Sequence, residues 1–184
     1  MTNKMTANQW KEILGLIPHP EGGFYRQNYK SSEFIREQNL PARFSGPRSF
    51  ATAIYFLLDN TDFSAFHRIR QDEIWHFYAG STLIIHEIDL QGEYRKTRLG
   101  IDWQQNEVPQ AIIPAGHLFG ATLSEAGGYA LLGCTVAPGF EFDDFELPGR
   151  AALLSQYPRH RTIIESLTRT GQAWKQVQGS RKIQ

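Results

Sequence analysis

The sequence predicts a mainly β protein, a sandwich or barrel with short helices near its two ends. From Ser49 to Val136, short apolar and aromatic runs alternate with turns rich in glycine, asparagine and aspartate. No helical period interrupts these runs, and aromatic residues make up 12% of the chain. Short strands at this spacing are typical of all-β sandwiches and barrels.

Length and charge narrow the function classes. The 184 residues fit one domain, which we place at residues 1–170, followed by a polar, loose tail at 171–184. Lys plus Arg equals Asp plus Glu at 19 each, so no net field favours nucleic acid or an anionic membrane as a partner. The lack of a long apolar run, the polar start of the chain and its single cysteine favour a cytoplasmic protein.

The N-terminal part predicts a helix, a turn and a strand. Thr6 can cap a helix, with Gln9 as its capping-box partner. Apolar residues then follow with helical spacing, and they are Trp10, Ile13, Leu14 and Ile17. The turn-rich segment 19–23 comes next, and 24–29 has the composition of a strand, while 31–47 is polar and predicts a surface loop.

The remaining elements follow from apolar runs and their punctuation. Strands are expected at 50–58, 64–69, 73–79, 82–90, 94–99, 111–114, 120–123 and 129–136. Short helices are expected around Ala151–Leu154 and around Ile163–Leu167.

The strand at 73–79 carries a carboxylate on its apolar face. Strand alternation puts Glu73 on the same side as Trp75 and Phe77. If that side faces inward, the buried carboxylate needs a partner, and His67 or an arginine is the nearest in sequence. These residues therefore predict one wall of a small-molecule pocket.

The next strand adds a third ionisable group. Its more apolar face consists of Thr82, Ile84, His86, Ile88 and Leu90, so His86 is expected to point inward. Three inward ionisable side chains on neighbouring strands, His67, Glu73 and His86, favour a binding or catalytic site over plain core packing.

Two motifs resemble those of a known family. Glu73, six residues and then Gly80 match the end of the first cupin motif, and Pro114-Ala115-Gly116 resembles the core of the second. More closely, the chain is similar to the cupin subfamily catalogued as domain of unknown function 985. The pieces that carry this likeness are 19–25, 49–58, 67–75, 114–116 and 133–146. The resemblance implies a double-stranded β-helix, or jelly roll, that pairs into a homodimer.

The resemblance also raises the question of whether this protein binds a metal ion. Metal-binding cupins use two histidines and a glutamate from the first motif and a histidine from the second. Here the second-motif position, three residues after Gly116, is Phe119. The first motif retains only His67, six residues before Glu73. We therefore expect no metal cofactor; the alternative is a divalent metal held by His67, Glu73 and either His86 or His117.

For function, the resemblance leaves three readings of an unidentified small ligand. The first is a metal-independent isomerase or epimerase acting on a small carbonyl compound, sugar or acid. Its base would be His67 or His86, and its acid a tyrosine at position 25, 55, 78 or 129. Arg26, Arg48 and Arg68 could hold a phosphate or carboxylate.

The second reading is a binding or sensor module without turnover. Its apolar wall would come from Phe24, Trp75, Phe77 and Phe119, with His67 and Glu73 orienting the ligand. Tyr25 and His117 are further candidate ligand-binding residues. The third reading is a metal-dependent oxygenase or isomerase. Neither the ligand nor the presence of catalysis follows from the sequence.

Overall fold

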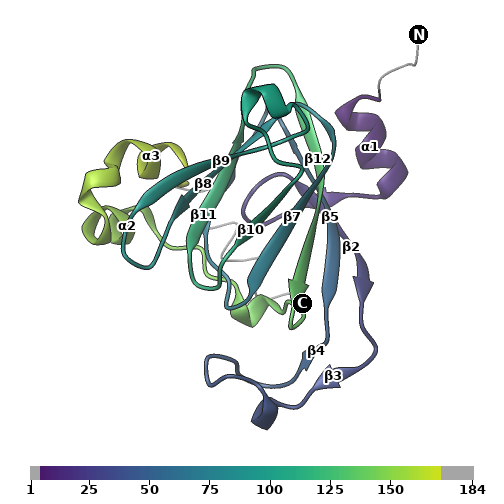
Figure 1. Ribbon diagram of the computed structural model, residues 1–184, viewed down its shortest axis with the longest axis vertical. Coiled ribbons are helices and arrows are strands. Elements are labelled where there is room, and N and C mark those ends of the chain that lie inside the picture. Colours follow the sequence, from purple (N-terminus) through teal and green to yellow (C-terminus); the bar gives the residue numbers. More distant parts are fainter. Residues whose placement is uncertain (1–4, 171–184) are drawn as a thin grey trace.

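The computed structural model describes residues 5–170 and consists of two facing antiparallel sheets flanked by helices (Figure 1). The predicted tail at 171–184 lies outside the described residues. The larger sheet has the order β1 (Ile17–Pro18), β2 (Phe24–Lys30), β5 (Thr52–Asp59), β12 (Tyr129–Ala137), β7 (Asp72–Gly80) and β10 (Gln110–Ile113). The smaller sheet has the order β6 (Ser64–His67), β11 (Leu118–Leu123), β8 (Leu83–Ile88) and β9 (Tyr94–Leu99). This is the predicted jelly roll.

The predicted N-terminal helix is confirmed as α1 (Ala7–Leu14), with Thr6 as N-cap and Gln9 completing the capping box. Its expected apolar face is shorter than predicted, because the helix ends at Leu14 and Ile17 lies in β1, and Ile13 is more than half exposed. The helix contacts the larger sheet instead through polar groups. Trp10 Nε1 donates to the Tyr129 hydroxyl at 3.0 Å, and Lys11 Nζ lies 2.6 Å from Asp59.

Removing the Thr6 cap should destabilise α1 alone. Thr6→Ala deletes the hydroxyl that accepts from the Gln9 amide, which costs about 1 kcal/mol of helix stability. Amide hydrogen exchange in residues 7–14 should become faster, while exchange in β12 stays as in the wild type. Unchanged protection of α1 would contradict this prediction.

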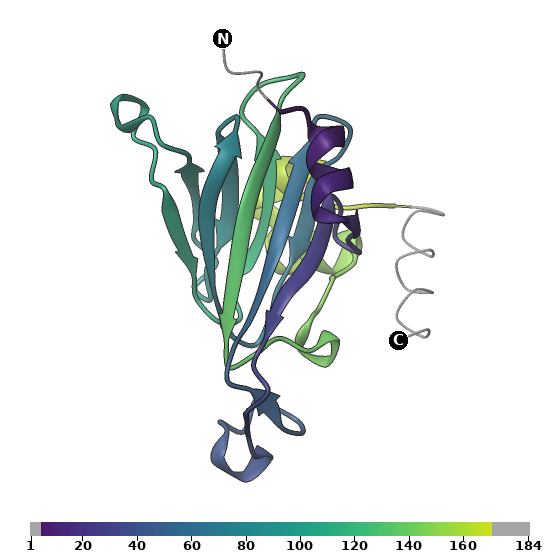
Figure 2. The same cartoon turned by 90° about the vertical axis from the view of Figure 1, so that its right-hand side faces the viewer.

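The segment predicted as a surface loop, 31–47, forms an arm beyond the main sheets (Figure 2). It contains the short strand β3 (Phe34–Ile35) and a 3-10 turn at Glu37–Asn39, and β3 pairs with β4 (Arg48–Ser49). The expected strand at 50–58 begins two residues later, at Thr52, because the chain bends between β4 and β5 and leaves Phe50 about half exposed. The arm therefore leads directly into the central strand of the larger sheet.

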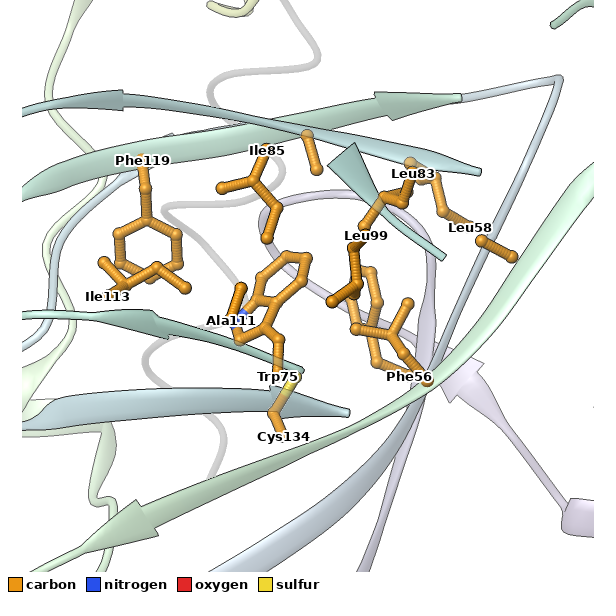
Figure 3. Packing of buried hydrophobic residues seen from close by; sticks show 13 residues of the cluster. Phe56, Leu58, Trp75, Leu83, Ile85, Leu99, Ala111, Ile113, Phe119 and Cys134 are labelled. Atoms are coloured by element: carbon orange, nitrogen blue, oxygen red, sulfur yellow. The ribbon is translucent and has the colours of Figure 1, made fainter. Parts of the chain in front are cut away.

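A hydrophobic core fills one part of the space between the two sheets (Figure 3). Trp75 and Phe56 from the larger sheet meet Leu83, Ile85 and Phe119 from the smaller one. Along β5, Leu58 belongs to this core, whereas Thr52 and Ile54 line a cavity. The core therefore occupies one part of the barrel and leaves the other part hollow.

Helices α2 (Arg150–Gln156) and α3 (Arg161–Ser166) cover the outer side of the smaller sheet. Leu153 and Ile164 pack there against Ile88 and Leu118. As a result, β8 is buried on both sides, with Leu83 and Ile85 facing the barrel core and Ile88 facing the helices. The predicted inward face of this strand, which held His86, is therefore wrong: both faces are apolar, so alternation could not tell them apart.

Candidate functional site

A cavity of about 260 Å³ opens between the larger sheet and the segment that follows β12. Its floor and walls come mainly from β2, β5, β6, β7 and β12, and its rim from residues 140–145. The lining residues are His19, Glu21, Tyr25, Gln27, Lys30, Thr52, Ile54, Phe56, His67, Ile69, Glu73, Cys134, Val136, Phe140, Glu141, Phe142 and Phe145.

Glu21 is brought into this cavity by a tight glycine turn. Gly22 and Gly23 have φ angles of 118° and 68°, in the region that side chains disfavour. A Cβ on Gly22 would lie 2.1 Å from the Phe63 carbonyl oxygen, so the position accepts only glycine without rearrangement. The turn leaves Glu21 only 5% exposed, beside β6.

The Glu21 carboxylate joins two histidines. Its Oε1 accepts from the Ser64 hydroxyl at 2.8 Å. Its Oε2 lies 3.1 Å from His67 Nε2 and 3.3 Å from His19 Nδ1. Burial on its own raises the pKa of Glu21, but the two histidines and the Ser64 hydroxyl outweigh it and lower that pKa to about 2. Glu21 is therefore ionised in the neutral pH range.

His67 uses both of its ring nitrogens inside the protein. Nδ1 lies 2.8 Å from the Ala65 carbonyl oxygen, which can only accept, so Nδ1 carries a proton. Nε2 faces Glu21, and the ring packs between Phe119 and Phe145 at centroid distances of 4.1 and 5.3 Å. Burial lowers the pKa of His67 despite the nearby carboxylate. Because Nδ1 is protonated, Nε2 can donate to the ionised Glu21 carboxylate, and so hold it in place, only when His67 carries both ring protons.

His19 is held differently. Its Nδ1 lies 3.3 Å from the Glu21 main-chain nitrogen, whose N–H donates to it, and 3.3 Å from Glu21 Oε2. The His19 ring stands edge-on to Tyr25 at a centroid distance of 4.6 Å. The hydrogen bond and the ion pair that His19 forms within residues 5–170 both involve Nδ1, not Nε2. His19 therefore combines an oriented ring with a second nitrogen that a ligand in the cavity can use.

Glu73 lines the same cavity but differs from Glu21 in its protonation state. Burial and the negative charge of Glu21 raise the pKa of Glu73 to about 8, although the nearby Cys134 and Trp75 side chains partly counteract this. One buried carboxyl therefore keeps its proton near neutral pH while the other has lost it. Such a divergence between two neighbouring carboxyls is how enzymes separate an acid from a base.

Comparison with known proteins identifies the family. The sequence profile described as Cupin superfamily (DUF985) matches residues 8–148. This chain belongs to that family. The cupin is similar to protein SO0799 from Shewanella oneidensis, with 40% identity, a TM-score of 0.82, and coverage of 91% of this chain and 99% of the other. It is also similar to a hypothetical protein from Leishmania major, with 33% identity, a TM-score of 0.81, and coverage of 90% and 100%.

A further relative is the uncharacterized protein YML079W of Saccharomyces cerevisiae, which is 26% identical over 149 residues, or 74% of the cupin and 70% of the relative. None of the helices within residues 5–170 of the cupin is long and apolar enough to span a membrane.

Three of the predicted site residues of the cupin meet at the cavity, namely His67, Glu73 and Tyr25. Trp75, Phe77 and Phe119 do face inward, as strand alternation predicts, but they pack in the barrel core and are not part of the cavity lining. The prediction that they form the ligand's apolar wall is wrong, because their side chains pack against one another and against the other core residues and do not reach the cavity. Phe56, Phe140, Phe142 and Phe145 supply that wall.

The other predicted site residues lie elsewhere. On β2, Tyr25 and Gln27 face the cavity, so Phe24 and Arg26 face outward, where Lys11 covers the Phe24 ring and Arg26 donates to the Leu14 carbonyl oxygen. Three consecutive strand residues cannot share one face, which is why this prediction fails for two of them.

Arg68, His86 and His117 are also outside the cavity lining. Arg68 lies 3.7 Å from Glu146, on a separate groove. His86 contacts the Tyr94 and Thr122 hydroxyls on the helix-covered side of the smaller sheet. His117 Nδ1 lies 2.5 Å from Glu87.

The alternative metal site does not fit this geometry. His86 and His117 are separated from His67 and Glu73, so the predicted ligands do not converge. In the cavity, His19 Nδ1 and His67 Nε2 lie 3.3 and 3.1 Å from the same carboxylate oxygen, Glu21 Oε2. Within residues 5–170, no group of three or more His, Cys, Asp or Glu side chains is arranged to hold a metal ion.

Sequence reasoning missed the two central residues, His19 and Glu21. Both come from a turn before the first long strand, and strand alternation says nothing about turns. A signal was nevertheless present: an ionisable pair spaced by one residue, directly before Gly22-Gly23, where glycines permit a close approach of the backbone.

Replacing Glu73 should stabilise the protein at neutral pH. Its folded pKa of about 8 exceeds the ordinary 4.5, so the folded protein binds this proton more tightly than the unfolded chain. Stability is therefore full below pH 4.5 and falls as pH rises toward 8. Glu73→Gln, which cannot ionise, should raise the free energy of unfolding by about 3 kcal/mol at pH 7 and little at pH 4.

Urea unfolding at the two pH values measures this effect. Glu125→Gln, at an exposed position, is the matched control and should change stability by less than about 0.5 kcal/mol at either pH. If Glu73→Gln shows the same pH dependence as the wild type, the buried carboxyl is not protonated as described.

Proposed function

We propose that this cupin is a small-molecule-binding protein that catalyses metal-independent proton transfer, as in an isomerase or epimerase acting on a carbonyl compound. The observation that carries the proposal is the His19–Glu21 pair, which faces a protonated Glu73 across one small cavity. A carboxylate that orients one nitrogen of an imidazole leaves the other nitrogen to exchange protons with a substrate.

The proposed reaction assigns one role to each group. In the tautomer that carries its proton on Nδ1 and donates it to Glu21 Oε2, His19 removes a proton with Nε2 from the carbon next to the substrate's carbonyl group. Glu73 donates a hydrogen bond or its proton to the carbonyl oxygen, which stabilises the enolate or enol that forms. Glu21 stabilises the imidazolium, and His67 with Ser64 holds Glu21 in position. In a substrate with a hydroxyl group on the reacting carbon, His19 then returns the proton to the former carbonyl carbon. The hydroxyl proton passes to Glu73, which replaces the proton that Glu73 gave to the carbonyl oxygen, so no atom is gained or lost.

A hydrogen-exchange experiment tests this function. The protein is incubated in D₂O with ketones, keto acids and unphosphorylated and phosphorylated sugars, and deuterium uptake is read by mass spectrometry against a protein-free control. We expect one class of carbonyl compound to gain deuterium at the carbon next to its carbonyl group.

The alternative of a non-catalytic binding module predicts a different outcome. It gains support from the aromatic wall of Phe140, Phe142 and Phe145, which could hold a ligand without any chemistry. Compounds that raise the melting temperature but gain no deuterium would favour the binding module over the enzyme.

A further inference from the structure

We infer that the cavity selects an uncharged carbonyl compound and rejects carboxylates and phosphates of the same skeleton. This inference rests on the proposed function and adds the substrate class to it. The charges on the cavity wall, the positions of the arginines and the apolar lining all bear on it.

The cavity offers little to an anion. Within residues 5–170, Lys30 is the only lysine or arginine on its wall. Lys30 is at the exposed end of β2, and its Nζ lies 2.5 Å from Glu141, which neutralises it. Deeper in the cavity stands the ionised Glu21. An anionic group at this depth would lose its hydration and meet no lysine or arginine, and the two histidines there already face the Glu21 carboxylate, so its burial costs several kcal/mol.

The arginines expected to bind an anion are engaged elsewhere. Arg48 forms two 2.7 Å bonds with Asp144 in a buried ion pair. Arg26 donates to the Leu14 carbonyl oxygen on the outer side of the larger sheet, and Arg68 pairs with Glu146. The bidentate guanidinium contact that usually recognises phosphate or carboxylate is therefore lacking on the described wall of the cavity.

The same wall suits an uncharged ligand. Ile54, Phe56 and Val136 form an apolar surface beside the polar groups, and the rings of Phe140 and Phe142 complete the rim. A protonated Glu73 can donate to a carbonyl oxygen without adding charge. At about 260 Å³ the cavity falls just below the range of about 300–1,000 Å³ usual for drug-sized ligands, so the compound is small.

Matched pairs of compounds test the inference. Phenylacetone is compared with phenylpyruvate, and dihydroxyacetone with its phosphate, by calorimetric titration and by deuterium uptake in D₂O. We expect the uncharged member of at least one pair to bind at least tenfold more tightly than its anionic partner. Tighter or equal binding of the anions, or binding of neither member of either pair, overturns the inference.

The two readouts separate this inference from the proposed function. Selective binding of an uncharged member without deuterium uptake keeps the substrate class and contradicts the catalytic role. Deuterium uptake confined to the anionic members keeps the catalytic role and contradicts the substrate class.

A variant at the mouth adds an independent check. Gln27 is exposed and lines the cavity, so Gln27→Arg supplies the lacking cation without disturbing the core. It should increase affinity for phenylpyruvate about tenfold relative to phenylacetone. Gln104→Arg, at an exposed position outside the cavity lining, is the matched control and should leave the ratio unchanged. A ratio that does not move in Gln27→Arg contradicts the view that lack of a cation causes the selectivity.

Discussion

Arg48→Met should lower the free energy of unfolding by about 3–5 kcal/mol. The Arg48 and Asp144 side chains are 3% and 0% exposed, and they share two 2.7 Å hydrogen bonds. Removing the guanidinium leaves a carboxylate out of contact with water, with the Gln71 amide donating to it at 2.6 Å. The loss is large because the Asp144 charge stays buried with Arg70, a partly exposed cation at 3.8 Å, as its remaining partner.

Urea unfolding measures this loss against a matched variant. Arg161→Met removes an exposed pair with Glu165 on one helix turn and should change stability by no more than about 0.5 kcal/mol. The double variant Arg48→Met/Asp144→Leu removes both charges and should recover most of the loss. A loss below 1 kcal/mol in Arg48→Met would mean that the pair is hydrated and not buried.

The Arg48–Asp144 ion pair also positions one side of the cavity rim. Asp144 belongs to the 3-10 turn Phe142–Asp144, and the rings of Phe142 and Phe145 on either side of it line the cavity. Arg48 also donates to the carbonyl oxygens of Ser45, Gly46 and Pro47 at the base of the arm. The pair therefore fixes one side of the cavity rim to the start of the larger sheet.

These contacts show why the sequence predicted the fold better than the site. Strand positions follow from local patterns, and β9 and β12 begin at the residues predicted from the glycine-containing turns that precede them. The contact between Arg48 and Asp144 joins positions 96 residues apart, and no local pattern announces it. The aromatic rim at 140–145 is brought to the cavity by that contact, so it could not be assigned from sequence.

Strand alternation was informative only where one face is exposed or chemically distinct. On β7 it correctly put Glu73 and Trp75 on the inner side. On β8 it failed for His86, because α2 and α3 bury the outer face with residues as apolar as those of the core. Glu21 could not be reached by this reasoning at all, since its position depends on two glycines with positive φ.

His19→Gln should reduce deuterium exchange into a bound carbonyl compound by about 10²–10⁴-fold, the usual contribution of a general acid or base. The change removes the nitrogen that faces the ligand but keeps a polar side chain beside Glu21, so binding should weaken far less than exchange. Exchange rates and ligand affinity are measured on the same preparation. Loss of affinity equal to the loss of rate would indicate that His19 only binds the compound.

Two comparisons make the role of His19 specific. His76→Gln, on the opposite side of the larger sheet where Nε2 contacts Thr135, should leave exchange unchanged. In His19→Ala, imidazole added to the buffer should restore part of the rate, because a free base can replace the missing side chain.

Exchange in the wild type should also decline as pH rises through about 8, where Glu73 loses the proton that it donates to the carbonyl oxygen. Rescue by imidazole together with this alkaline decline would separate proton transfer from a merely structural effect, because a misfolded cavity would show neither.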